Sequence, residues 1–183
     1  MKDTFEGADE LVILVDNQDN ETGIQDKLSV HQLGLLHRAF SVFVFNSKNE
    51  LILQQRADGK YHSPGLWTNT CCSHPKPGEN TIDACKRRLM EEMGMKCNLE
   101  FSFSFMYRCE FSNGLTEYEF DHVYLGYTDD LPVLNYSEVK DWKYVNLIDL
   151  EKEIESHPEK FTEWLKICFS RLIEHTQSYQ IKP

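Results

Sequence analysis

The sequence predicts an α/β fold of the α+β kind, with a mixed β-sheet sandwiched between helices. Apolar runs of strand length recur along the chain, and short polar turns join several of them. Segments with the apolar spacing of helices are interspersed with these runs. With 183 residues, 40% hydrophobic content and no internal repeat, residues 1–183 are expected to form a single domain. Residues 1–9 are expected to be a flexible N-terminal segment.

The first half of the chain predicts strands followed by a long loop. Residues 10–20 (ELVILVDNQDN) form an apolar run that leads into a polar turn, which is typical of a strand end. Residues 37–56 predict a buried hairpin with its turn at SKNE. Residues 57–78 contain three glycines and three prolines, so a long loop is expected there. Loops of this length inside compact domains are often functional.

Residues 80–93 predict an amphipathic helix. One apolar stripe runs along it, and Gly94 supplies a C-terminal stop. The stripe consists of Ile82, Cys85, Leu89 and Met93.

The second half of the chain predicts a further hairpin and two helices. Residues 101–110 and 115–127 pair naturally around the turn SNG. A strand is expected near 142–146, followed by helices at about 148–155 and 159–175.

Charge and composition limit the classes of partner. The formal net charge of −11 argues against nucleic acid or an anionic membrane surface. The chain contains no apolar run approaching the ~18 residues of a membrane span. The acidic start without an apolar segment predicts no secretory signal, and the six cysteines suit a reducing compartment. We therefore expect a cytoplasmic protein, a monomer or weak dimer, that binds a small molecule.

The stretch TNTCCSHP at residues 68–75 places two cysteines just before a histidine. In an extended segment side chains alternate, so Cys72 and His74 share a face while Cys71 points away. One interpretation makes Cys72 an acid–base thiol beside a metal-bound histidine. The other is a pair of buried cysteines that serve only packing.

Carboxylates and histidines suggest a cation site. Glu117 and Glu119 lie two residues apart on a predicted strand and therefore share a face. The pair either faces solvent or binds a divalent cation, because two buried like charges need one. His31, His37 and His74 would complete a nitrogen and oxygen set suited to Mn²⁺, Zn²⁺ or Mg²⁺.

Two segments follow the Nudix box, G-x5-E-x7-R-E-U-x-E-E-x-G-U, where U is aliphatic. SHPKPGE (73–79) is followed after seven residues by RRLMEEMGM (87–95). Ser73 replaces the first glycine, and Arg88 replaces a glutamate that gathers Mg²⁺ in Nudix hydrolases. A guanidinium there removes a metal ligand and can clamp a diphosphate directly.

Together with HRAFSVFVFN, WTNTCCSHP and EYE, these segments resemble the type 1 isopentenyl diphosphate isomerase family, from about residue 10 to the C-terminus. The resemblance implies a Nudix fold and a metal-dependent interconversion of isopentenyl and dimethylallyl diphosphate by a 1,3-proton shift. It implies Cys72, Glu119 and Tyr107 as catalytic residues, and Lys27, Arg56, Lys60, Arg88 and Trp164 as substrate-binding residues. It implies His31, His37, His74, Glu117 and Glu119 as ligands of Mn²⁺, Zn²⁺ or Mg²⁺, and Glu92 for a Mg²⁺ that bridges to the diphosphate.

The reaction adds a proton at C4 of the substrate and removes one from C2. Glu119 is the candidate for protonating C4 and Cys72 for taking the C2 proton, although the reaction is reversible and the order stays open. The face of Trp164 can stabilise the cation by ~2 kcal/mol. A Nudix hydrolase of a nucleoside or prenyl diphosphate and a non-catalytic binding module are the alternatives. Arg88 and the combination of Cys72 with the metal set favour the isomerase.

Overall fold

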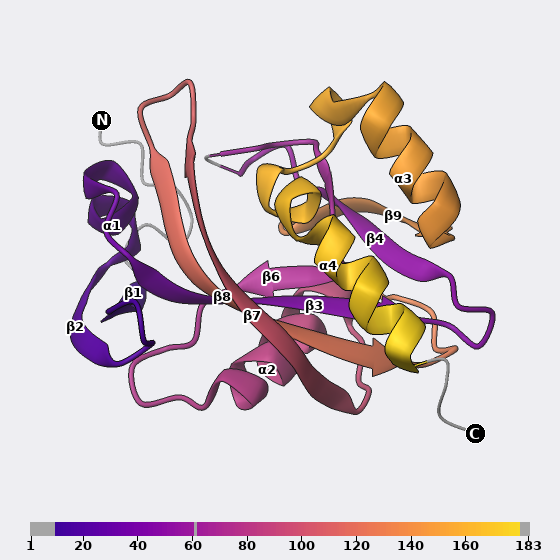
Figure 1. Cartoon of the computed structure of the whole chain (residues 1–183), viewed down its shortest axis with the longest axis horizontal. Coiled ribbons are helices and arrows are strands. Elements are labelled where there is room, and N and C mark those ends of the chain that lie inside the picture. Colours follow the sequence, from indigo (N-terminus) through magenta and orange to yellow (C-terminus); the bar gives the residue numbers. More distant parts are fainter. Residues whose placement is uncertain (1–9, 61, 180–183) are drawn as a thin grey trace.

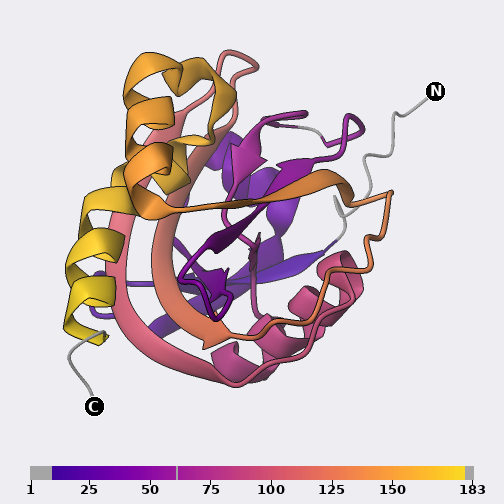
Figure 2. The ribbon, with the colours of Figure 1, turned by 90° about the vertical axis from the view of Figure 1, so that its right-hand side faces the viewer.

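The computed structural model describes residues 10–60 and 62–179 (Figure 1). The expected flexibility of residues 1–9 lies outside these ranges. A mixed sheet of nine strands has the helix α2 on one face and the helices α3 and α4 on the other (Figure 2). The predicted fold class is confirmed. None of the helices in the described ranges is long and apolar enough to cross a membrane.

The strands are β1 (Leu11–Val15), β2 (Glu21–Asp26), β3 (His37–Phe45), β4 (Leu51–Arg56), β5 (Trp67–Thr68), β6 (Cys71–Ser73), β7 (Leu99–Glu110), β8 (Thr116–Tyr127) and β9 (Val139–Val145). The helices are α1 (Lys27–Leu33), α2 (Thr81–Met93), α3 (Leu147–Ser156) and α4 (Glu163–Tyr179). The last helix was predicted to begin at residue 159. A short 3-10 turn, Pro158–Lys160, occupies that position, and α4 begins at Glu163. The β7–β8 hairpin and α2 form as predicted.

The predicted hairpin of β3 and β4 forms, but its paired part is short. The two strands follow each other through a short turn, but they pair only at Phe45 and Leu51. β3 instead runs parallel to β8, from the pair His37 and Glu119 onward, and β4 runs antiparallel to β9. β3 is buried along almost its whole length and therefore needs sheet partners on both edges. This parallel pairing places His37 beside Glu119.

The helix α1, with the preceding strand β2, was not predicted. Asp26 caps α1 by accepting a hydrogen bond from the Ser29 amide at 2.9 Å, and Gly34 ends the helix in the left-handed conformation. Lys27 and His31 lie four residues apart on this helix and therefore share one face. The short length of α1 and the polarity of β2 explain why neither has a clear periodic signal.

The two faces of the sheet carry separate cores. On one face, residues of β7, β8 and α4 pack together, with Phe105, Leu165 and Phe169 among them. On the other face α2 buries Cys85, Leu89 and Met93 against β3, as the apolar stripe predicts. Residues 62–78 contain the short strands β5 and β6, and Cys71 and Cys72 of β6 contact different cores.

Gly94 fixes the end of α2 against the segment that leads to β9. It has a φ of 63°, and a Cβ atom there would lie 2.6 Å from the Val133 carbonyl oxygen. Gly94→Ala is expected to lower the free energy of unfolding by about 2–3 kcal/mol and Tm by about 5–10 °C. Gly78 has a similar φ of 77° with no atom near its Cβ position, so Gly78→Ala should cost about 1 kcal/mol. Equal losses in thermal denaturation would contradict the role of the Val133 contact.

Candidate active site

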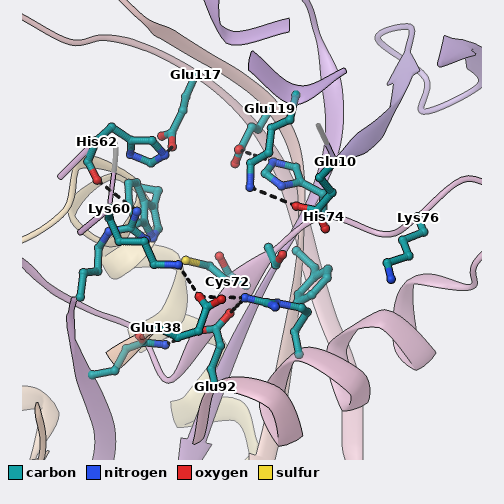
Figure 3. Close-up of a pocket in the computed structure, with 18 of the residues that line it drawn as sticks. Glu10, Lys60, His62, Cys72, His74, Lys76, Glu92, Glu117, Glu119 and Glu138 are labelled. Carbon is teal, nitrogen blue, oxygen red and sulfur yellow. Dashed lines mark hydrogen bonds and ion pairs between the residues drawn. The ribbon is translucent and has the colours of Figure 1, made fainter. Parts of the chain in front are cut away.

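A cavity of about 580 Å³ opens between β3, β6, β8, the start of α4 and the C-terminal half of α2. Figure 3 shows Glu117, Glu119 and His74 at one end of it, Glu92 and Glu138 at the other, and Cys72 between them. The predicted site residues that line the cavity are Lys27, Arg56, Lys60, Cys72, His74, Arg88, Glu92, Tyr107, Glu117, Glu119 and Trp164. His31 and His37 are buried behind His74.

One end of the cavity holds a cluster that can bind a metal ion. One ligand atom from each of His31, His37, His74 and Glu119 lies within 4.8 Å of all the others. His74 Nε2 lies 3.2 Å from His37 Nε2 and 3.0 Å from Glu119 Oε1. His37 Nδ1 lies 2.9 Å from the Leu35 carbonyl oxygen, so Nδ1 carries the proton and Nε2 presents its lone pair to the cluster.

The protonation states of the cluster suit a metal ion. Burial lowers the pKa of His31 to about 2 and that of His74 to about 4, so both imidazoles are neutral at pH 7, which is the form that binds metals. Although burial opposes ionisation of Glu119, the neighbouring His37 and His74 rings hold the pKa of this carboxyl well below its usual range. Imidazole nitrogens and a carboxylate fit a divalent cation such as Zn²⁺ or Mn²⁺.

Glu117, the fifth predicted ligand, lies outside this four-residue group. Its Oε1 is 3.4 Å from His62 Nε2, and its Oε2 is 2.9 Å from the Tyr107 hydroxyl. The same hydroxyl lies 2.7 Å from Glu119 Oε2. Burial and the charge of Glu119 raise the pKa of Glu117 well above its usual value, and the hydrogen bond that Tyr107 donates only partly opposes this effect. The role of Glu117 as a metal ligand stays a prediction.

The two adjacent cysteines have different surroundings, as the strand alternation predicts. β6 pairs with β3 so that Cys72 lies opposite Ser41 and Cys71 lies opposite Val42. Cys72 lines the cavity, whereas Cys71 is fully buried in the core beneath α2. Burial raises the pKa of the Cys72 thiol to about 12, and the nearby Arg56 charge only partly opposes this effect. Cys72 is therefore a protonated thiol at pH 7.

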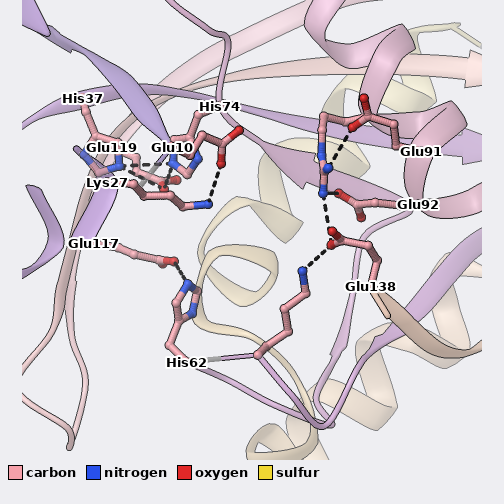
Figure 4. Close-up of polar contacts among 12 residues, drawn as sticks. Glu10, Lys27, His37, His62, His74, Glu91, Glu92, Glu117, Glu119 and Glu138 are labelled. Carbon is pink, nitrogen blue, oxygen red and sulfur yellow. Dashed lines mark hydrogen bonds and ion pairs between the residues drawn. The ribbon is translucent and has the colours of Figure 1, made fainter. Parts of the chain in front are cut away.

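The four cationic side chains that the sequence predicts to bind the diphosphate all line the cavity. Three form ion pairs with carboxylates (Figure 4): Lys27 with Glu10, Lys60 with Glu138, and Arg88 with Glu91, Glu92 and Glu138. The fourth, Arg56, donates hydrogen bonds to the carbonyl oxygens of residues 62 and 63, and its guanidinium lies 5.2 Å from the centre of the Trp164 ring. The Trp164 indole N–H donates to Asn69 at 3.1 Å, which fixes the ring at the cavity wall.

Two features of the cavity were not predicted from the sequence. His62 is buried, with its ring 5.2 Å from Phe111 and 5.9 Å from Trp164. Its position two residues after Lys60, in the predicted functional loop, could have identified it. Glu10 and Glu138 also line the cavity, but no sequence pattern links them to distant lysines and arginines.

Comparison with known proteins places the chain in a family. The NUDIX domain model matches residues 35–165. Isopentenyl-diphosphate Delta-isomerase 2 of Aromatoleum aromaticum is 54% identical over 162 residues, which cover 88% of this chain and 86% of the relative. Isopentenyl-diphosphate Delta-isomerase of Pectobacterium atrosepticum is 47% identical, with 92% and 94% covered.

Among solved structures, the fold is similar to that of DR0079 from Deinococcus radiodurans. The TM-score is 0.75 at 20% sequence identity, covering 88% of this chain and 98% of the other. This likeness supports the fold alone, whereas the two sequence relatives carry the assignment. The chain therefore belongs to the isopentenyl-diphosphate Delta-isomerase family and carries a Nudix domain.

Proposed function

We propose that this protein interconverts isopentenyl and dimethylallyl diphosphate by a 1,3-proton shift. The observation that carries the proposal is one cavity that holds a metal-binding cluster, a thiol and a set of cations. Hydrolysis of a diphosphate has no use for Cys72 beside such a cluster. The names of the two relatives agree with an isomerase.

The cations supply binding energy for positioning. Lys27, Arg56, Lys60 and Arg88 would hold the diphosphate, with a Mg²⁺ at Glu92 bridging to it. Their contacts do not change during the reaction, so they fix the prenyl group within the cavity rather than lower the barrier directly. Charge-assisted hydrogen bonds from guanidinium groups to phosphate oxygens are stronger than neutral ones.

Cys72 and Glu119 would form the acid–base pair. Isomerisation of isopentenyl diphosphate forms a C–H bond at C4 and breaks one at C2, with a tertiary cation at C3 between the two steps. At pH 7 the protonated Cys72 thiol and the ionised Glu119 carboxylate favour proton delivery by Cys72 and proton removal by Glu119. This order is the reverse of the one expected from the sequence. A divalent cation held by the three histidines and Glu119 would supply positive charge that keeps the Glu119 carboxylate ionised.

The aromatic ring of Trp164 offers a surface for the cationic intermediate. Trp164 is almost fully buried at the cavity wall, with Arg56 near its ring. An indole face can stabilise a desolvated cation by ~2 kcal/mol, which is a small part of the barrier. Trp164 therefore serves mainly to exclude water and shape the prenyl pocket.

Proton NMR of the protein with isopentenyl diphosphate and Mg²⁺ in D₂O tests the proposal. We expect signals of dimethylallyl diphosphate, with deuterium in the newly formed methyl group. Release of phosphate or pyrophosphate with unchanged olefin signals would instead indicate a Nudix hydrolase. No change after addition of Mn²⁺ or Zn²⁺ would indicate a binding module.

Several finer points stay predictions from the sequence. They are the choice among Mn²⁺, Zn²⁺ and Mg²⁺ at the cluster, Mg²⁺ at Glu92, a cytoplasmic location, a monomer or weak dimer, and the absence of nucleic-acid or membrane partners.

A further inference from the structure

Glu138 bridges two cations of the proposed diphosphate site. Its Oε2 forms an ion pair with Lys60 Nζ and lies 3.1 Å from Arg88 Nη2. All three side chains line the cavity, and Figure 4 shows dashed lines that reach the Glu138 carboxylate from two sides. One oxygen shared by an ammonium and a guanidinium is the arrangement that a phosphate oxygen would adopt there.

The backbone around Glu138 holds it in this position. The Ala57 amide donates to the Glu138 carbonyl oxygen at 3.1 Å, just after β4. The Asn135 amide donates to the Glu92 carbonyl oxygen at 3.0 Å, near the end of α2. Glu138 is therefore fixed between the two elements that lead to Lys60 and Arg88. Its side chain is only 15% exposed, unlike a surface glutamate.

Two carboxylate partners of Arg88, Glu91 and Glu138, differ in their position relative to the cavity. Glu91 Oε2 lies 2.8 Å from Arg88 Nη1, but the Glu91 side chain is 42% exposed and is not among the residues that line the cavity. Within residues 10–60 and 62–179, Glu138 is the carboxylate that forms ion pairs with both Lys60 and Arg88. Both glutamates contact Arg88, but Glu138 does so inside the cavity and Glu91 outside it. Removing the charge of each in turn therefore separates an effect on the cavity from a general effect on Arg88.

We propose that Glu138 is an internal counterion, a specificity-determining residue that the substrate diphosphate must displace from Lys60 and Arg88. The inference rests on the proposed function. An anion with one phosphoryl group would only replace the Glu138 oxygen between Lys60 and Arg88 with one of its own oxygens. It would therefore gain little binding free energy. A diphosphate can take the same bridging position and still offer oxygens to Lys27 and Arg56. The carboxylate therefore disfavours single phosphates and also keeps the two cations ordered between turnovers.

Isothermal titration calorimetry with inorganic pyrophosphate and with orthophosphate, in Mg²⁺-free buffer of low ionic strength, tests the inference. Glu138→Gln is expected to bind pyrophosphate about tenfold more tightly than the unaltered protein, because a repelling charge is removed. Orthophosphate binding should become measurable in this variant. Glu138→Asp, which keeps the charge, should stay within about threefold of the unaltered protein for both anions.

Glu91→Gln is the matched control and should change the pyrophosphate Kd by less than about twofold. Unchanged or weaker pyrophosphate binding by Glu138→Gln would overturn the inference, since a residue that only supports the fold weakens binding when it is altered. The NMR assay separates this result from failure of the proposed function. Isomerisation without tighter binding rejects the counterion alone, and tighter binding without isomerisation rejects the proposed reaction alone.

Discussion

Cys72→Ala is expected to lower kcat about a thousandfold or more, because a positioned acid or base contributes about 10²–10⁴-fold to a proton transfer. Alanine cannot exchange a proton, and no other thiol lines the cavity in the described part of the chain. The Kd for inorganic pyrophosphate should stay within about threefold, since the cations are unchanged. NMR turnover rates and calorimetry measure the two quantities separately.

Cys71→Ala provides the control for this variant. Cys71 is equally a cysteine of β6, but its side chain is buried in the core beneath α2. Its loss should cost about 1 kcal/mol of stability and leave kcat within about twofold. Inactivation by Cys71→Ala, or near-normal turnover by Cys72→Ala, would show that the wrong cysteine had been assigned.

Removal of metal ions by a chelator is expected to reduce turnover to the background rate. The same treatment should lower Tm by about 5–10 °C, because a ligand present at about 100 times its Kd stabilises the folded state by about 2.7 kcal/mol. Added Mn²⁺, Zn²⁺ or Mg²⁺ should restore both quantities. Metal analysis of the purified protein and thermal denaturation with and without added metal give readouts that are independent of activity.

Two histidine variants locate the metal effect. His74→Ala removes a nitrogen that lies 3.2 Å from His37 Nε2, so added metal should no longer raise its Tm. His157→Ala alters a half-exposed side chain beside Glu159 and should retain the full metal response. A metal-induced rise in Tm that survives in His74→Ala would place the ion elsewhere.

The sequence predicted much of the site because local rules apply to its motifs. Strand alternation separates Cys72 from Cys71, and the helix pattern defines α2 with Arg88 and Glu92. The four residues that approach one another in the metal-binding cluster were all in the predicted ligand set. These assignments depended on short segments and on a family resemblance.

The parts that could not be predicted depend on contacts between distant segments. Local patterns predict the hairpin of β3 and β4, but they carry no signal for the parallel pairing of β3 with β8. Glu138 meets Lys60 only because the segment before β9 returns to the end of β4. Glu117 illustrates the limit within a strand. Alternation places it on the face of Glu119, but the side-chain contact with His62 directs its carboxylate away from the cluster.

The parallel pairing of β3 and β8 also bears on how the chain folds. Side chains on these strands, such as Ser41 and Asp121, meet although they lie 80 positions apart in the sequence. Closing so large a loop carries an entropic cost that is recovered only when many contacts form together, so this pairing is expected late in folding. Because His37 and Glu119 sit at one end of that pairing, the metal-binding cluster cannot form in a partly folded chain. Time-resolved metal uptake during refolding would therefore report completion of the native topology.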